Sequence, residues 1–164
     1  MLGSVAGKRI LDAGCGNGFL ARRIRDSHPA LEVTSVDIFR PEAELPGDFC
    51  QAQLHALPFQ SAAFDLVICS HTLEHCLNAD AVLVELKRVC AGVLIIVVPQ
   101  QRPYYYTLDE HVQFYYYEEQ LTKAVGLREF ECQSLVGDWF YRGFVETAQP
   151  LEAQPPSLSL NPNK

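Results

Sequence analysis

The sequence predicts an α/β fold in which a parallel β-sheet is flanked by helices and ends in an antiparallel hairpin. Three observations lead to this prediction. Short β-branched runs alternate with amphipathic helical runs along the chain, a pattern typical of parallel sheets covered by helices. A glycine-rich turn at residues 14–18 joins the first strand-like run to the first helical run. Two strand-like segments, residues 128–137 and 138–148, meet around Gly137 and Asp138, as the strands of a hairpin do.

Five short segments form the expected parallel part of the sheet. All of them except residues 49–53 are rich in valine, isoleucine and leucine, as buried strands are. We expect these strands at residues 8–13, 31–38, 49–53, 65–70 and 93–99. Residues 39–49 contain two prolines and one glycine. The connection between the second and third strands is therefore expected to be a loop or a single turn.

Three segments place apolar side chains at helical spacing and charged side chains on the other face. We expect helices at residues 19–27, 78–90 and 117–126. His28 and Pro29 end the first of them. Glycines are expected to end the other two, Gly92 the second and Gly126 the third.

One folded domain is expected to occupy residues 1–148. The protein has 164 residues, and a domain of about 150 residues buries about 70% of its unfolded surface without help from disulfides or metal. Residues 149–164 are rich in proline and serine and have no periodicity. We therefore expect them to form a disordered tail.

Charge and cysteine usage restrict the class of function and the compartment. The formal net charge of -7 argues against a general electrostatic grip on nucleic acid or on an anionic membrane. The longest apolar run, residues 91–99, is too short to span a bilayer. The 6 cysteines form no Cys-x-x-Cys pair, and the start of the sequence lacks the pattern of a secretory signal. We therefore expect free thiols in a cytoplasmic protein.

The strongest motif is the glycine-rich turn after the first strand. Its glycines alternate with other residues over positions 14–18, which allows positive φ angles and the close approach of a ligand. The dinucleotide fingerprint G-x-G-x-x-G is not matched, because Phe19 stands at its third glycine position. Asp12 precedes the turn and disfavours a pyrophosphate but suits a ligand with a positive centre. Asp37 ends the second strand, where an acid accepts hydrogen bonds from ribose hydroxyls. The site is predicted to bind a ribose joined to a cationic or zwitterionic group.

Three segments in this order resemble the class I S-adenosylmethionine-dependent methyltransferases, in particular the small methyltransferases of type 11. The first is Asp12-x-Gly-x-Gly-x-Gly followed by Asp37. The second is LPFQSAAFDLVICSHTLEH at residues 57–75, and the third is ELKRVCAGVLIIVVP at residues 85–99. The resemblance covers residues 8–148. It implies a Rossmann-like sheet, S-adenosyl-L-methionine as the cofactor, and an enzyme that moves a methyl group to an acceptor.

The resemblance also implies a role for individual residues of the cofactor site. The turn would lie against the methionine part of the cofactor, Asp12 near its ammonium group, Asp37 on the ribose and Ile38 beside the adenine. At the position where the family often has an acid that contacts the adenine amino group, this sequence has Gln53, whose amide can still donate and accept. The implied cofactor-binding residues are Asp12, Gly14, Cys15, Gly16, Asn17, Gly18, Asp37, Ile38, Gln53, Leu54 and Ser70.

Methyl transfer needs a base only when the acceptor must lose a proton. The candidates for catalysis are His71, which the resemblance places beside the transfer site, and His111, in the region that relatives use to contact substrate. The segment H-x-x-E-H, ending at His75, also spells an inverted zinc-peptidase motif. It resembles the loop after the fourth strand of methyltransferases, and no remote third ligand is evident. We therefore expect no metal.

The acceptor is expected to be a small molecule and not a nucleic acid. No Asn-Pro-Pro-Tyr follows the fourth strand, no Pro-Cys pair offers the nucleophile of cytosine methylation, and the net charge is negative. Six of the 7 tyrosines lie in residues 99–117 and form either an acceptor pocket or aromatic packing. Without a separate cap domain, acceptor choice is expected to come from residues 99–117, the loop after the fourth strand or a second chain. A non-catalytic S-adenosylmethionine-binding partner is the alternative function, and a homodimer or a partner chain could cover the cleft.

Overall fold

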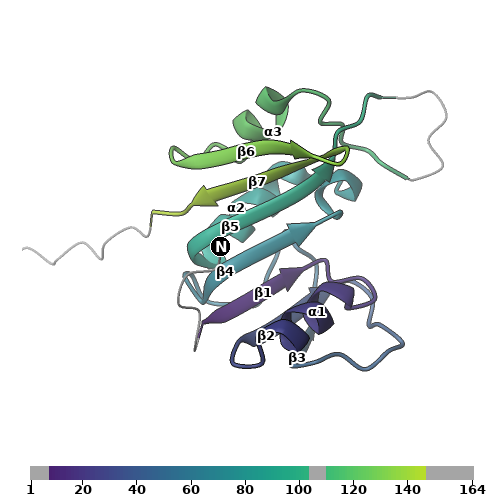
Figure 1. The fold of residues 1–164 in the computed structure, drawn as a ribbon, viewed down its shortest axis with the longest axis vertical. Coiled ribbons are helices and arrows are strands. Elements are labelled where there is room, and N and C mark those ends of the chain that lie inside the picture. Colours follow the sequence, from purple (N-terminus) through teal and green to yellow (C-terminus); the bar gives the residue numbers. More distant parts are fainter. Residues whose placement is uncertain (1–7, 104–109, 147–164) are drawn as a thin grey trace, which may run out of the picture.

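The computed structural model describes residues 8–103 and 110–146. Seven strands form one sheet in the order β3-β2-β1-β4-β5-β7-β6 (Figure 1). The strands are β1 (Arg9–Ala13), β2 (Glu32–Asp37), β3 (Asp48–Gln51), β4 (Phe64–Ser70), β5 (Cys90–Pro99), β6 (Phe130–Leu135) and β7 (Asp138–Phe144). The helices are α1 (Phe19–Ser27), α2 (Ala79–Val89) and α3 (Glu118–Val125), and η1 (Leu73–His75) is a single 3-10 turn.

The predicted α/β class is confirmed, with a parallel body and an antiparallel end. Strands β1 to β5 pair in parallel, so their carboxyl ends share one edge of the sheet, where the arrowheads of β1, β4 and β5 point in Figure 1. Strand β7 is antiparallel to both β5 and β6. The hairpin therefore folds back so that its second strand, and not its first, joins the sheet. Its turn has positive φ at Val136 (53°) and Gly137 (92°), which suits the right-handed twist of a hairpin.

The two faces of the sheet are covered unequally. Figure 1 shows α1 in front of the sheet and α2 behind it. Alternate strand residues such as Leu11 and Val67 pack with the buried residues of α2 and α3 in the larger core. The opposite alternation, including Ile10 and Leu66, packs with Ala21 of α1 in a smaller core. This burial of alternate residues on opposite faces is what makes the strand runs apolar throughout.

The role expected of Gly92 is wrong. Helix α2 ends at Val89 and β5 begins at the next residue, so this glycine lies inside the strand. The register between β4 and β5 shifts between Phe64 and Leu66. A Cβ added at Gly92 would stand 2.7 Å from the backbone oxygen of Asp65. Glycine is needed here because two backbones approach closely at an irregularity of the sheet.

The structure describes the predicted loop and all of the cysteines, but not the predicted tail. Residues 38–47, all described, contain no helix, as their prolines indicate. All 6 cysteines fall within the described ranges and are free thiols. No described helix is long and apolar enough to cross a membrane. The predicted tail, residues 149–164, lies outside the described residues.

Candidate functional site

The glycine-rich turn leaves β1 at the carboxyl edge of the sheet and is tied to the end of β2. The backbone N–H groups of Gly14 and Cys15 both donate to the Val36 carbonyl, at 2.8 and 3.0 Å. The N–H of Gly18 donates back to the Cys15 carbonyl at 2.8 Å, which closes the turn just before α1. The turn is therefore held in a fixed position beside the carboxyl end of β2.

Two of the glycines are needed for different reasons. Gly14 has φ of +77°, and a Cβ there would stand 2.3 Å from the side chain of Thr72, which packs from the loop after β4. The Thr72 hydroxyl donates to the Gly14 carbonyl at 3.2 Å. Gly16 has φ of +52°, and a Cβ there would meet no atom of the described chain within 4 Å. The backbone at Gly16 is therefore open to a ligand.

Asp37 links the end of β2 to the glycine-rich turn. One carboxylate oxygen accepts the N–H of Gly16 at 2.8 Å, and the other accepts the N–H of Phe39 at 3.1 Å. An ionised carboxylate offers about four lone-pair sites. Asp37 thus orients its carboxylate through two backbone donors and retains capacity to accept further hydrogen bonds.

Asp12 is a buried acid beneath the turn. It is 2% exposed, and its Oδ2 has no hydrogen-bond partner among the described residues. Burial raises the pKa of Asp12 to about 6, the Ala21 backbone N–H lowers it, and the charge of Asp37 raises it further. A carboxylate in this position is incompletely satisfied and favours a cation nearby.

A pocket of about 760 Å³ opens beside the turn at the carboxyl ends of the strands. This volume lies in the range of small-molecule sites. The predicted cofactor residues that line it are Gly14, Asp37, Ile38, Gln53 and Leu54. Residues of the lining that the sequence analysis did not single out as cofactor contacts are Gln51, Ala52, His55, Thr72, His75, Cys76, Leu77, Asn78 and Val82. Most of these lie in the segments that follow β3 and β4, before the next regular strand or helix. Their place after a strand is the signal that could have identified them.

Among the described residues, Cys15, Asn17 and Gly18 do not line the 760 Å³ pocket, and they contribute to the shape of the turn instead. The Asn17 side chain accepts the Phe19 N–H at 3.0 Å, where α1 begins. A Cβ at Gly18 would overlap the side chain of Leu45. Burial raises the pKa of the Cys15 thiol to about 12.

Ser70, the last residue of β4, and His71, the first of the loop after it, are also not among the described residues that line the pocket. The backbone carbonyl of Ser70 accepts the Thr72 hydroxyl at 3.1 Å. His71 has φ of 50°. Its Nδ1 lies 3.6 Å from Glu74 Oε1 and its Nε2 lies 3.5 Å from Asp138 Oδ2. The ring is half exposed. The carboxylates of Glu74 and Asp138, one beside each ring nitrogen, orient it in the loop after β4.

The structure brings His111 to the segment that holds His75. Their rings meet edge to face with centroids 4.8 Å apart. Glu74, His75 and His111 each offer one metal-ligating atom, and these atoms lie within 4.8 Å of one another. His111, far from this segment in the sequence, thus supplies a third side chain of ligating type, and it approaches only through the path of the chain after β5.

The tyrosine-rich region is described in part. Tyr115 is buried, and its carbonyl accepts the indole N–H of Trp139 at 2.9 Å. The Arg102 guanidinium donates to the Tyr116 hydroxyl at 2.7 Å and stacks over that ring. Through Trp139, this part of the region packs onto the beginning of β7. The remaining three tyrosines of the cluster, residues 104–106, lie outside the described residues.

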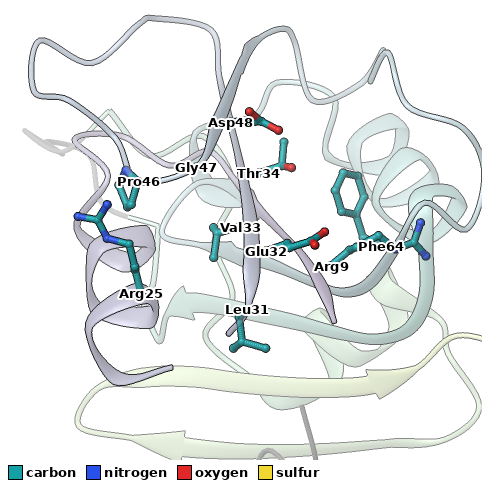
Figure 2. A pocket seen from close by; sticks show the side chains of 10 residues that line it. All are labelled: Arg9, Arg25, Leu31, Glu32, Val33, Thr34, Pro46, Gly47, Asp48 and Phe64. Carbon is teal, nitrogen blue, oxygen red and sulfur yellow. The ribbon is translucent and has the colours of Figure 1, made fainter. Parts of the chain in front are cut away.

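A second hollow, of about 300 Å³, lies at the other edge of the sheet. Figure 2 shows its side chains, which include the first residues of β1 to β4: Arg9, Glu32, Asp48 and Phe64. Ligands of doubly wound sheets bind at the carboxyl ends of the strands. This hollow at the amino ends is therefore not a candidate for the cofactor.

Comparison with known proteins identifies the family. The family model described as "Methyltransferase domain" matches residues 11–96, which include the glycine-rich turn, Asp37 and strands β2 to β4. The chain belongs to the methyltransferase domain family. The predicted resemblance to class I S-adenosylmethionine-dependent methyltransferases, the Rossmann-like sheet and S-adenosylmethionine as the cofactor of the family are confirmed.

The relatives of this methyltransferase domain include two named O-methyltransferases. It is 34% identical over 145 residues to malonyl-[acyl-carrier protein] O-methyltransferase of Enterobacter lignolyticus, covering 77% of this chain and 57% of that protein. It is 29% identical over 123 residues to ubiquinone biosynthesis O-methyltransferase of Chromobacterium violaceum, covering 68% and 49%. The chain thus spans about half the length of the curated relatives it matches.

Solved structures agree with the fold. The magnesium protoporphyrin IX methyltransferase of Synechocystis PCC 6803, solved with bound SAH, superposes with a TM-score of 0.65 at 18% identity. The match covers 88% of this chain and 77% of that chain. It supports the sheet and helices described above.

Proposed function

We propose that this methyltransferase domain binds S-adenosylmethionine in the 760 Å³ pocket and transfers its methyl group to an oxygen of a small-molecule acceptor. The observation that carries the proposal is the pocket itself. It lies at the carboxyl edge of the sheet and joins the glycine-rich turn to Asp37, the two features that the sequence assigns to this cofactor. The two relatives named above are O-methyltransferases, which supports an oxygen acceptor.

The residues present fit this cofactor, in each case for a reason visible in the structure. The open backbone at Gly16 would lie against the methionine part. The remaining lone pairs of Asp37 would accept the ribose hydroxyls. The half-exposed Ile38 and the amide of Gln53, both in the lining, would contact the adenine. The Asp12 carboxylate, whose Oδ2 has no hydrogen-bond partner among the described residues, would attract the ammonium group of the cofactor from beneath the turn.

The bound cofactor supplies a methyl group on a positively charged sulfur, which is already activated for displacement. The protein therefore mainly has to align the acceptor and exclude water. Where the acceptor hydroxyl must lose a proton, the His71 ring would receive it. Glu74 and Asp138, within 3.6 Å of its two nitrogens, would hold that ring in place.

Calorimetry with S-adenosylmethionine tests the cofactor site. The Asp37→Ala variant is expected to bind about 1–3 kcal/mol more weakly, because ribose hydroxyls and the Gly16 N–H lose their acceptor. The control is Asp48→Ala, which removes an acid from the opposite edge of the same sheet and should leave the affinity unchanged. Equal affinities of wild type and Asp37→Ala would remove Asp37 from the site.

Turnover tests the reaction. The full chain is incubated with labelled S-adenosylmethionine and a panel of small hydroxyl and carboxyl acceptors, and label in the acceptor is counted. Tight cofactor binding without transfer to any acceptor would favour the non-catalytic, cofactor-binding alternative. Competition by NAD instead of S-adenosylmethionine would indicate an oxidoreductase.

A further inference from the structure

Backbone hydrogen bonds hold residues 110–113 against the 3-10 turn η1. The Glu74 carbonyl accepts the N–H groups of Val112 and Gln113, at 2.8 and 2.9 Å. The Gln113 side chain donates to the Cys76 carbonyl at 3.1 Å. The position of His111 beside η1 is therefore fixed by the main chain, and the contact does not depend on the side chains alone.

From this arrangement we infer that Glu74, His75 and His111 form a binding site for a divalent first-row transition-metal ion. One ligating atom of each lies within 4.8 Å of the other two. Ligands bound to one ion at about 2.0–2.2 Å in tetrahedral geometry stand about 3.4 Å apart. Side-chain rotations that close gaps of about 1.5 Å would therefore bring all three atoms into coordination.

The carboxylate of Glu74 is an independent indication of a cation. Glu74 is fully buried, and neither of its side-chain oxygens has a hydrogen-bond partner in the described part of the chain. A buried carboxylate surrounded by imidazoles and without hydrogen bonds is costly unless it is paired or coordinates a metal.

The two histidines are held as metal-ligating histidines usually are. The Nδ1 of His75 lies 3.4 Å from the Glu110 carbonyl, and the Nδ1 of His111 contacts the amide oxygen of Gln101. Each partner oxygen can only accept, so these contacts fit the tautomer that carries its proton on Nδ1. In metal sites the second ring nitrogen of a ligating histidine donates to such an oxygen, which sets the tautomer and the ring orientation.

The ligand set selects the ion. Two imidazoles and one carboxylate suit zinc, cobalt, manganese or iron(II), whereas calcium and magnesium prefer sites made of oxygen ligands. The site takes one ion through nitrogen and oxygen ligands and leaves coordination positions open.

The open positions have a consequence for the acceptor, and this step alone depends on the proposed function. His75 also lines the 760 Å³ pocket, so an ion bound to it would stand at the pocket wall. A metal ion there would bind an acceptor hydroxyl and hold it in one orientation. The metal site itself depends only on the three side chains.

Metal titration of the purified, reduced and chelator-treated full chain tests the inference. Cobalt(II) binding is followed by its visible absorption and manganese(II) binding by loss of the free-ion magnetic resonance signal. We expect one ion per chain in each case. Glu74→Gln and His111→Ala should each weaken binding by more than the about 10–100-fold that removal of a supporting hydrogen bond costs in metal sites. The matched control is His28→Ala, which removes a histidine from the end of α1 and should bind as the wild type does.

Several outcomes would overturn the site. They are no binding of either ion by the wild type, an unchanged affinity in both variants, or an equal loss in His28→Ala. If Glu74→Gln does not fold, as judged by circular dichroism, His111→Ala decides the question. S-adenosylmethionine affinity is measured separately on the same samples. A failure of metal binding is therefore distinguishable from a failure of cofactor binding.

Discussion

Replacement of Asp12 by asparagine should change the stability of the protein in a pH-dependent way. Burial raises the pKa of Asp12 from 3.8 to about 6, so the folded state keeps its proton to a higher pH than the unfolded state does. This group therefore costs no stability below pH 3.8, and its cost grows as the pH rises to about 6 and is constant above that. The full difference corresponds to about 3 kcal/mol.

The measurable quantity is the change in the effect of Asp12→Asn between two pH values. Between pH 5 and pH 7.5 the free energy of unfolding of the variant should gain about 1.4 kcal/mol relative to wild type. A constant cost for the new amide, whose N–H groups are buried, cancels in this difference. The same pH range therefore isolates the charge of Asp12 from the packing of its replacement.

Urea unfolding, monitored by circular dichroism at both pH values, gives these free energies. The control is Ser35→Ala, because Ser35 pairs with Asp12 in the register of β1 and β2 and is buried but neutral. Its effect should not vary with pH. An Asp12→Asn effect that is as flat as that of the control would refute the reasoning, since Asp12 would then keep the same affinity for its proton on folding.

Substitutions at three further positions test the glycine-rich turn and the loop before β4. Gly14→Ala should lower the free energy of unfolding by about 2–4 kcal/mol, since its Cβ overlaps the side chain of Thr72 at a positive φ; urea unfolding measures this. Gly16→Ala should cost only about 1 kcal/mol of stability but weaken S-adenosylmethionine binding in calorimetry, since its Cβ points into open space. Arg88→Ala should cost about 1–3 kcal/mol in urea unfolding, because this guanidinium bonds Glu85 and two carbonyls of the loop before β4. Arg88→Lys should recover only part of this, because lysine lacks the planar fork.

The sequence was most informative where structure is local. Helix α1 begins and ends at the predicted residues 19–27, since its apolar spacing and the following His28-Pro29 act within a few residues. Asp37 and the glycine-rich turn were recognisable because each follows a strand directly. The hairpin was recognisable from two adjacent strand-like runs, although its pairing order was not.

Features that depend on contact between distant segments were not recognisable. Glycine is needed at position 92 because β4 approaches β5 closely where their register is irregular. The sequence pattern of either segment alone does not show this approach. His111 reaches His75 because backbone bonds hold residues 110–113 against η1. Thr72 fills the space beside Gly14 from a loop 58 residues away. In each case the decisive neighbour belongs to another segment.

Two acids at the carboxyl edge of the sheet are buried without enough hydrogen-bond partners, and we infer a different cation for each. Asp12 and Glu74 are both almost fully buried, and both have side-chain oxygens without hydrogen-bond partners within the described ranges. Burial raises the pKa of each, so each destabilises the ligand-free fold at neutral pH. Asp12 lies beneath the turn that would receive the cofactor ammonium, and Glu74 lies between histidines that can ligate a metal. A cation that binds such a carboxylate offsets the free-energy cost of its burial. Asp12 and Glu74 therefore lower the stability of the ligand-free protein and favour the binding of cations at these two places.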